Sequence, residues 1–129
     1  MRGALLALTV LCSLRGSLCL YQGEELALPE AELAFDDLQD PSASTSGPGV
    51  KGRDGCRTPM VWETTENGGF VQPTHPWLPV DARHQPLAVT CQEASSDSPL
   101  NRIRQLLKQL RNSELLRQGK QSLINLPLL

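Results

Sequence analysis

Apolar residues gather near both ends of the chain. The first group runs from Ala4 to Leu14, stops at Arg15-Gly16 and is followed by a shorter apolar run over residues 17–21. Glycine just after an apolar helical segment is typical of a helix end. A short, continuous apolar run suits a strand that is buried on both faces. The pattern therefore predicts a helix over residues 3–14 and a buried strand over residues 17–21.

The second group is a helical stripe near the carboxyl end. Large aliphatic residues recur there at helical spacing: Leu100, Ile103, Leu106, Leu107 and Leu110. Asp97-Ser98-Pro99 precedes them, and a capping side chain followed by proline is a favourable helix start. We therefore expect an amphipathic helix over residues 98–111 that packs its apolar stripe on another element. A membrane-surface helix is the alternative, but the stripe contains no Trp or Phe.

The sequence between these groups, residues 22–96, is expected to be mainly loop. The chain contains 10 Pro and 10 Gly, and only 4% of its residues are aromatic, which leaves few large side chains to anchor a core. Residues 42–50 contain Ser, Thr, Gly, Pro and Ala without any aromatic residue, a composition typical of a flexible linker.

Charge and cysteine spacing exclude several classes of function. The 12 Lys and Arg residues are balanced by 14 Asp and Glu residues without a basic cluster, which argues against a nucleic-acid partner. The amino-terminal run is shorter than the roughly 20 apolar residues that span a membrane, so no membrane partner is expected. The cysteines form no C-x-x-C pair, so we expect buried free thiols and no metal or cofactor. They are Cys12, Cys19, Cys56 and Cys91.

Four short motifs follow one another through the middle of the chain. They are Tyr21-Gln-Gly-Glu-Glu-Leu26, Arg53-Asp-Gly-Cys-Arg-Thr-Pro-Met-Val-Trp62, Asn67-Gly-Gly-Phe70 and Pro76-Trp-Leu-Pro-Val80. In order and spacing they resemble the eighth strand and the following long loop of alpha-glucosidases of the alpha-amylase superfamily. The resemblance covers most of the chain. It implies an α/β fold, namely the carboxyl-terminal part of a TIM (β/α)8 barrel.

The resemblance also implies a domain organisation. Residues 1–118 correspond to a partial glycosidase barrel, and residues 119–129 correspond to the start of a carboxyl-terminal β-domain. Residues 42–50 stand where this family has an aromatic segment, so this stretch is aberrant. Our hypothesis is a compensated frameshift whose reading frame recovers by Lys51, which the coding DNA would test.

Arg57 is the first candidate for substrate binding. By the resemblance, this arginine forms a charge pair with an Asp from an early barrel loop beside the cleaved sugar bond. That Asp is not in this chain, so we expect Arg57 to lack the partner that aims it. For Arg53 and Asp54, a local ion pair or turn is the alternative to sugar contact. For Met60 and Trp62, the alternative to lining the sugar pocket is packing beneath the loop.

No catalytic residue is predicted in this chain. Retaining hydrolysis needs two carboxyl groups about 5 to 5.5 Å apart, and the resemblance places them after the fourth and fifth strands. A third Asp follows the seventh strand, also upstream of the matched region. The chain is thus expected to supply pocket residues for an alpha-glucoside or oligosaccharide substrate, while being inactive alone. The implied protein partner is the missing remainder of the barrel.

The amino-terminal run has a second interpretation. Ser17 and Cys19 are small residues placed where a signal peptidase would cut after an apolar run. A small secreted binding protein, with residues 1–19 as signal peptide and a carboxyl-terminal amphipathic helix, is therefore the alternative function. The resemblance favours the seventh barrel helix and a cytoplasmic location instead.

Overall fold

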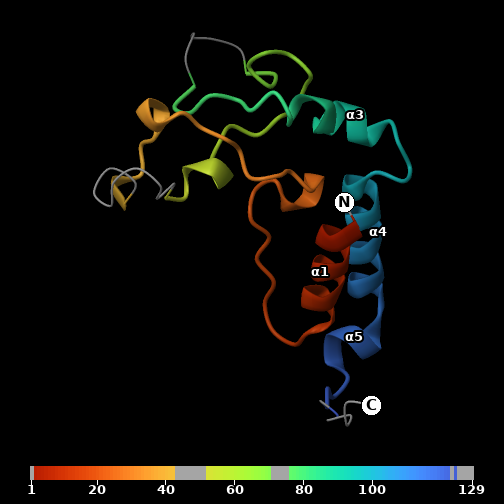
Figure 1. Ribbon diagram of the computed structural model, residues 1–129. Helices are drawn as coiled ribbons and strands as arrows, with labels where there is room; N and C mark the ends of the chain where they lie inside the picture. The colour runs from red at the N-terminus through yellow and green to blue at the C-terminus, as the bar shows by residue number, and fades with distance from the viewer. Residues whose placement is uncertain (1, 43–51, 71–75, 123, 125–129) are drawn as a thin grey trace, which may run out of the picture.

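The computed structural model describes residues 2–42, 52–70, 76–122 and 124, and within them the fold is helical. The α-helices are α1 (Arg2–Ser13), α3 (Val89–Glu93), α4 (Pro99–Asn112) and α5 (Glu114–Gln118) (Figure 1). Short 3-10 helices lie at Glu24–Leu26, Phe35–Asp37, Asp54–Cys56 and Gln85–Leu87. These described residues contain no strand.

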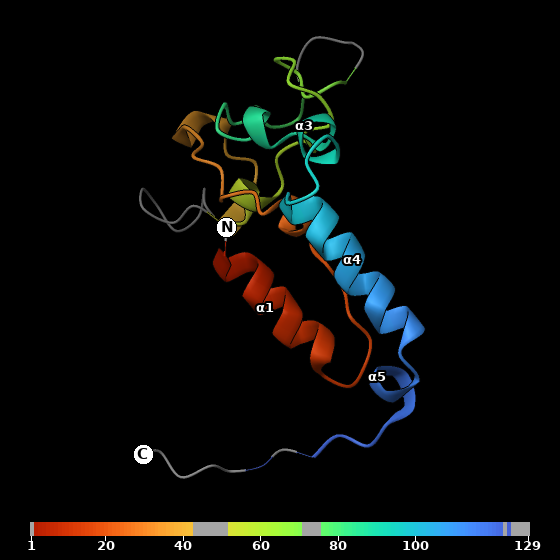
Figure 2. The ribbon, with the colours of Figure 1, turned by 90° about the vertical axis from the view of Figure 1, so that its right-hand side faces the viewer.

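Helix α1 confirms the helix predicted over residues 3–14, with its end one residue earlier. It lies beside α4 and runs in the same direction in both ribbon views (Figure 1, Figure 2). Leu8 and Cys12 are the buried residues of α1. Gly16 adopts a φ of 123° in the turn that follows, a conformation that residues with a Cβ avoid. The turn sends the chain back along the helix pair.

The strand predicted over residues 17–21 is not confirmed. The segment runs back beside α1 toward the 3-10 helix at Glu24–Leu26 (Figure 1), without strand pairing. A strand is held by hydrogen bonds to a neighbouring strand, and no other described segment of this chain offers one. Leu18, Cys19 and Tyr21 are exposed, so the predicted burial of this segment is wrong as well, because both burial and strand pairing depend on elements outside the described chain.

Helix α4 confirms the helix predicted over residues 98–111, shifted by one residue. The Ser98 hydroxyl accepts a hydrogen bond from the Asn101 N–H at 3.2 Å, the cap that the sequence predicts. Leu100 and Ile103 are buried, whereas Leu107 is exposed. The apolar stripe is therefore only partly covered. Ser113 caps α5 in the same way, and this short helix was not predicted.

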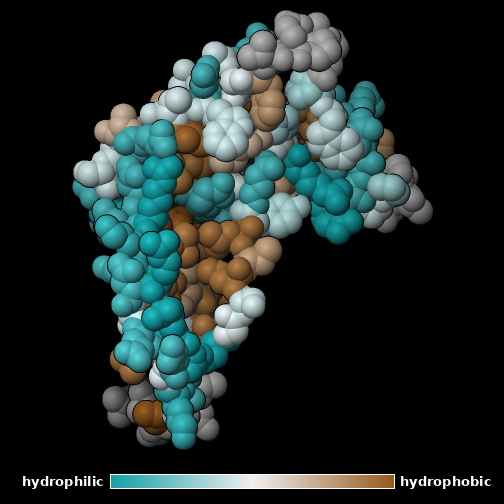
Figure 3. Space-filling model, turned by 180° about the vertical axis from the view of Figure 1, so that it is seen from behind, coloured by the Kyte–Doolittle hydropathy of each residue, from teal (hydrophilic) through white to brown (hydrophobic). Residues whose placement is uncertain are grey.

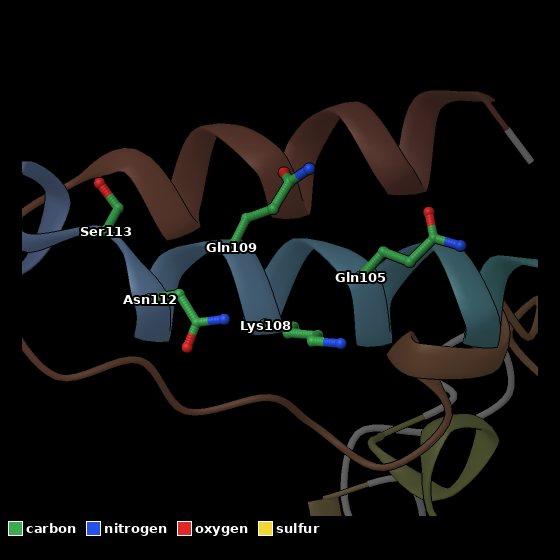
Figure 4. Close-up of a pocket in the computed structure, with 5 residues that line it drawn as sticks. All are labelled: Gln105, Lys108, Gln109, Asn112 and Ser113. Atoms are coloured by element: carbon green, nitrogen blue, oxygen red, sulfur yellow. The ribbon is translucent and has the colours of Figure 1, made fainter.

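The polar side of α4 is exposed. It forms an open hollow lined by Gln105, Lys108, Gln109, Asn112 and Ser113 (Figure 4). Amide, hydroxyl and amine groups line this hollow without a carboxylate. It therefore offers no acid or nucleophile for sugar chemistry, and we treat it as the solvated side of the helix.

The described part of the predicted long loop, residues 22–42, 52–70 and 76–96, is more ordered than its composition suggests. It contains α3 and packs around a core cluster of Leu26, Val61, Ala88 and Leu100. The Val89 N–H donates to the Val61 carbonyl at 3.0 Å. Because Leu100 belongs to α4, this cluster fixes the loop on the first turn of that helix.

Gln92 joins the loop to α4 through hydrogen bonds that the sequence does not reveal. Its side-chain amide donates to the Leu26 carbonyl at 2.9 Å and to the Leu87 carbonyl at 2.8 Å. Its side-chain oxygen accepts the Leu100 N–H at 3.0 Å. Only 5% of Gln92 is exposed. One side chain therefore satisfies three backbone groups that would otherwise be buried without partners.

Several other predictions meet the structure only in part. The β-tail over residues 119–129 lies mostly outside the described residues, and 119–122 and 124 form no strand. Residues 43–50 of the aberrant segment also lie outside them.

All four cysteines are free as expected, but only Cys12 is buried. Three thiols are exposed because they lie on loop and helix surfaces, which corrects the prediction of buried thiols. No described helix is both long enough and apolar enough to span a membrane.

Candidate functional site

The candidate residues lie at one end of the helix pair. The loop after residues 17–21 gathers where α1 and α4 begin (Figure 1). This is the end toward which the returning segment 17–21 runs. In a barrel, the loops after the strands carry the substrate site, so this position suits a substrate-facing loop.

Arg57 follows the 3-10 helix Asp54–Cys56, and its side chain is 35% exposed. Its Nη1 lies 4.0 Å from Oδ2 of Asp40. Its carbonyl accepts a 3.4 Å hydrogen bond from the Trp77 indole. One part of the guanidinium thus faces a carboxylate while another part faces solvent. This corrects the expectation that Arg57 has no partner in this chain.

For Arg53 and Asp54, the alternative interpretation was a local ion pair or turn: the structure shows the turn, the 3-10 helix Asp54–Cys56, while Arg53 pairs with Asp40 and not with Asp54. Asp54 is fully buried, and its Oδ2 accepts the N–H groups of Gln39 at 2.6 Å and Asp40 at 2.7 Å. Arg53 is mostly exposed, with Nε 3.5 Å from Asp40 Oδ2. Asp54 therefore shapes the loop from within, and Arg53 is the more accessible of the two.

Met60 and Trp62 differ in burial although they are two residues apart. Met60 is partly buried and packs against the core cluster that contains Leu26 and Val61. Trp62 is 51% exposed, and the backbone N–H of Trp62 donates to the Gly68 carbonyl at 2.8 Å. An exposed indole is available to stack on a sugar ring, whereas the Met60 contacts are those of a packing residue.

Asp40 is a site residue that the sequence analysis missed. It is 4% exposed, and Oδ1 accepts both the hydroxyl of Ser42 at 2.6 Å and its N–H at 3.0 Å. Oδ2 accepts the Arg53 N–H at 3.0 Å. These hydrogen bonds, those from Ser42 foremost, hold the pKa of Asp40 well below its ordinary value. The only sequence signal was an Asp-Pro pair at the edge of the aberrant segment.

A second cluster of charged residues, outside the Arg53–Trp62 motif, holds two parts of the loop together. Arg83 bonds Asp81 at 2.6 Å and Glu32 at 3.2 Å, and the Glu32 N–H donates to Asp81 at 3.0 Å. The Nε2 of buried His84 lies 2.8 Å from the Pro29 carbonyl. The cluster joins two loop segments far apart in sequence, so its role is structural.

Stability is expected to fall in acid because of these two aspartates. Hydrogen bonds from Arg83 hold the pKa of Asp81 far below its ordinary value, as those from Ser42 do for Asp40. A carboxyl group with a lowered folded-state pKa stabilises the fold above its unfolded-state pKa, about 4. That contribution is lost as pH falls below about 4. Urea unfolding at pH 7, 5 and 3 should show a lower midpoint only at pH 3.

The matched control for this acid effect is Asp81→Asn. It should lower the urea midpoint at pH 7 and reduce the difference between pH 5 and pH 3. An equal drop between pH 5 and pH 3 in the variant and the parent chain would show that Asp81 is not the titrating group.

The described residues contain no group of three or more His, Cys, Asp or Glu side chains placed to hold a metal ion. The chemistry of the site therefore consists of arginines, buried aspartates that hold the backbone, and an exposed indole. Such groups bind and orient polar ligands.

The family profile described as alpha amylase, catalytic domain, matches residues 1–119. This chain belongs to the alpha-amylase family. The alpha-amylase-family chain is 55% identical over 104 residues to a probable alpha-glucosidase of Rhizobium meliloti, covering 81% of this chain and 19% of the relative. It is 34% identical over 110 residues to a salivary alpha-glucosidase of Anopheles gambiae, covering 83% and 18%.

A solved structure agrees with this assignment. The alpha-glucosyl transfer enzyme XgtA shares 50% identity with the alpha-amylase-family chain at a TM-score of 0.85, over 91% of this chain and 22% of that chain. The resemblance to alpha-glucosidases and the partial-barrel fold are confirmed at this level. The chain spans about a fifth of the length of the relatives it matches.

Proposed function

We propose that this chain supplies part of the substrate pocket of a retaining alpha-glucosidase and lacks the carboxylates that cleave the sugar bond. The observation that carries the proposal is the partly exposed side chain of Arg57, which lies in the loop of a chain that is 55% identical to a probable alpha-glucosidase. The proposed substrate class is alpha-glucosides, including malto-oligosaccharides.

Arg57 suits sugar binding because a guanidinium carries five donors in a planar fork. One edge can face a carboxylate while the other donates to sugar hydroxyls. Arg53 and Trp62 add an exposed cation and an exposed aromatic face in the same motif. Asp54 and Met60 are proposed to support the pocket from beneath, through the contacts described above.

The absence of catalytic carboxylates is part of the proposal. Retaining hydrolysis requires a nucleophile and an acid about 5 to 5.5 Å apart, both accessible to the sugar. Asp40 and Asp54 are buried and engaged by backbone N–H groups, so neither is free to attack. The nucleophile and the acid would come from the rest of the barrel.

The apolar surface favours the remainder of a barrel as protein partner. Seen from behind, the molecule exposes an apolar patch beside a polar one (Figure 3). A groove between α1, α4 and α5, here called the apolar groove, is lined mainly by exposed aliphatic residues: Leu11, Leu14, Leu18, Leu107 and Leu116. Arg15, Arg111 and Arg117 also line it. XgtA, of which this chain covers 22%, has most of its chain available to cover such a surface.

A cytoplasmic location stays a prediction. The packing of α1 against α4 favours retention of residues 1–19, because cleavage near Cys19 would remove a helix that buries Leu8 and Cys12.

Hydrolysis, rather than glucosyl transfer, is the proposed main reaction because several relatives are glucosidases, although XgtA is a transfer enzyme. Product analysis distinguishes the two reactions.

A chimera tests the proposed function. The matched segment of the Rhizobium meliloti relative is replaced by this chain, and hydrolysis of p-nitrophenyl alpha-glucoside is measured. Arg57→Lys should raise KM about tenfold, equivalent to about 1.4 kcal/mol, because lysine lacks the forked donors. Arg102→Lys on α4, whose exposed side chain pairs with Asp97 and lies outside the apolar groove, is the matched control and should leave KM unchanged.

The unmodified chain is assayed beside the chimera and should show no turnover. Turnover by the purified chain alone would contradict the proposal that the catalytic acids lie elsewhere. A folded chimera without activity would contradict the proposal that this loop completes a glucosidase pocket.

A further inference from the structure

Two buried aspartates tie together the chain segments on either side of residues 43–51. Asp54 accepts the N–H groups of Gln39 and Asp40, while Asp40 in turn accepts the N–H of Arg53. Each carboxylate thus holds the backbone of the segment that carries the other. The arrangement fixes where Asp40 lies relative to the Arg53–Trp62 motif.

The Asp40 side chain has little room to move. It is 4% exposed, and Ser42 holds its other oxygen through a 2.6 Å hydrogen bond. A Cβ at Gly52, where φ is 60°, would lie 2.9 Å from the Asp40 Cβ and 3.0 Å from its Cγ. Only glycine fits there without displacement of the carboxylate. Asp40 is therefore a fixed negative charge at the base of the loop.

That fixed charge faces both arginines of the motif. Arg53 Nε lies 3.5 Å and Arg57 Nη1 lies 4.0 Å from the same oxygen, Oδ2. Arg53 is also held through its backbone N–H, whereas the described side-chain contact of Arg57 is this ion pair alone. The direction of the Arg57 guanidinium therefore depends more strongly on Asp40.

We propose that Asp40 is a positioning residue that orients Arg57 toward the sugar. It adds, from within this chain, a second carboxylate to the aiming role that the family resemblance assigns to an Asp of an early barrel loop. The inference deepens the proposed function and rests on it for the identity of the ligand. It assigns Asp40 no contact with the sugar, so its effect on substrate passes through Arg57.

The first test uses the full chain without sugar. Asp40→Asn keeps the side-chain shape but removes the charge. The ¹⁵N–¹H heteronuclear NOE of the Arg57 Nε–H group should fall, because the guanidinium becomes more mobile. Asp36→Asn, in an exposed 3-10 helix, is the control and should leave the NOE unchanged. An unchanged NOE in Asp40→Asn would overturn the inference, whatever ligand Arg57 binds.

The second test uses the chimera. Asp40→Asn should raise KM about fivefold, the scale expected when a charged hydrogen bond from Arg57 to the sugar is weakened. The value of kcat should stay within about twofold. In an Arg57→Lys background the same substitution should change KM no further, because the two residues act as one unit. Fully additive effects on KM would assign Asp40 a structural role only and overturn the inference.

A milder variant applies if Asp40→Asn does not fold. Ser42→Ala removes one hydrogen bond from Asp40 and should lower the Arg57 NOE by a smaller amount. No change in that variant would overturn the inference. If the NOE responds but KM does not, the positioning stands and the proposed sugar contact of Arg57 fails.

Discussion

Replacing Gln92 with leucine is expected to lower the free energy of unfolding by about 3 kcal/mol. The substitution keeps a side chain of similar size but makes it apolar, which leaves the Leu26 and Leu87 carbonyls and the Leu100 N–H without their partner. Each buried polar group left unpaired costs about 1–3 kcal/mol, and partial rearrangement reduces the sum. Urea unfolding followed by far-ultraviolet circular dichroism measures the change.

Gln105→Leu is the matched control for this prediction. It makes the same substitution on the exposed, polar side of α4 (Figure 4), where surface changes stay within about 0.5 kcal/mol. Equal unfolding midpoints for the two variants would show that the Gln92 hydrogen bonds do not stabilise the fold.

Gln92 also shows why the loop could not be predicted from sequence. Its hydrogen-bond partners extend to Leu26, 66 residues earlier, and no local pattern marks such a pairing. The bounds of α1 and α4, by contrast, were predicted to within one residue at each end. Their signals are local, namely an apolar stripe and a capping serine before proline.

The segment over residues 17–21 illustrates the opposite case. Its apolar run predicted a buried strand, but Leu18 and Tyr21 are exposed, and strand pairing is a property of two segments. The described chain supplies only one of them. The apolar run therefore predicts a strand of the whole barrel better than it predicts the structure of this chain alone.

The candidate site divides in the same way. Arg57 could be named because it lies within a recognisable motif. Asp40 could not, because its partners Arg53 and Arg57 lie 13 or more residues away, beyond the aberrant segment. Motif comparison finds the residues expected to touch substrate, while the residues that hold them require the structure.

A charge in the apolar groove is expected to abolish assembly with the rest of a barrel. The full chain is co-expressed with the upstream part of the Rhizobium meliloti relative, ending where the matched segment begins, and alpha-glucoside hydrolysis is measured. Leu14 is 48% exposed and lines the groove. Leu14→Asp should reduce the reconstituted activity at least about 100-fold, because desolvation of a buried carboxylate costs several kcal/mol even where arginines such as Arg15 and Arg111 line the groove.

Gln109→Asp on the polar side of α4 is the control, because it adds the same charge away from the apolar groove. It should leave the reconstituted activity unchanged. Since Leu14 is already half exposed in the chain by itself, Leu14→Asp should scarcely alter the unfolding midpoint of the unassembled chain. A loss of activity with no loss of chain stability therefore reports on docking. Equal reconstitution by Leu14→Asp and Gln109→Asp would mean that the barrel remainder does not cover this groove.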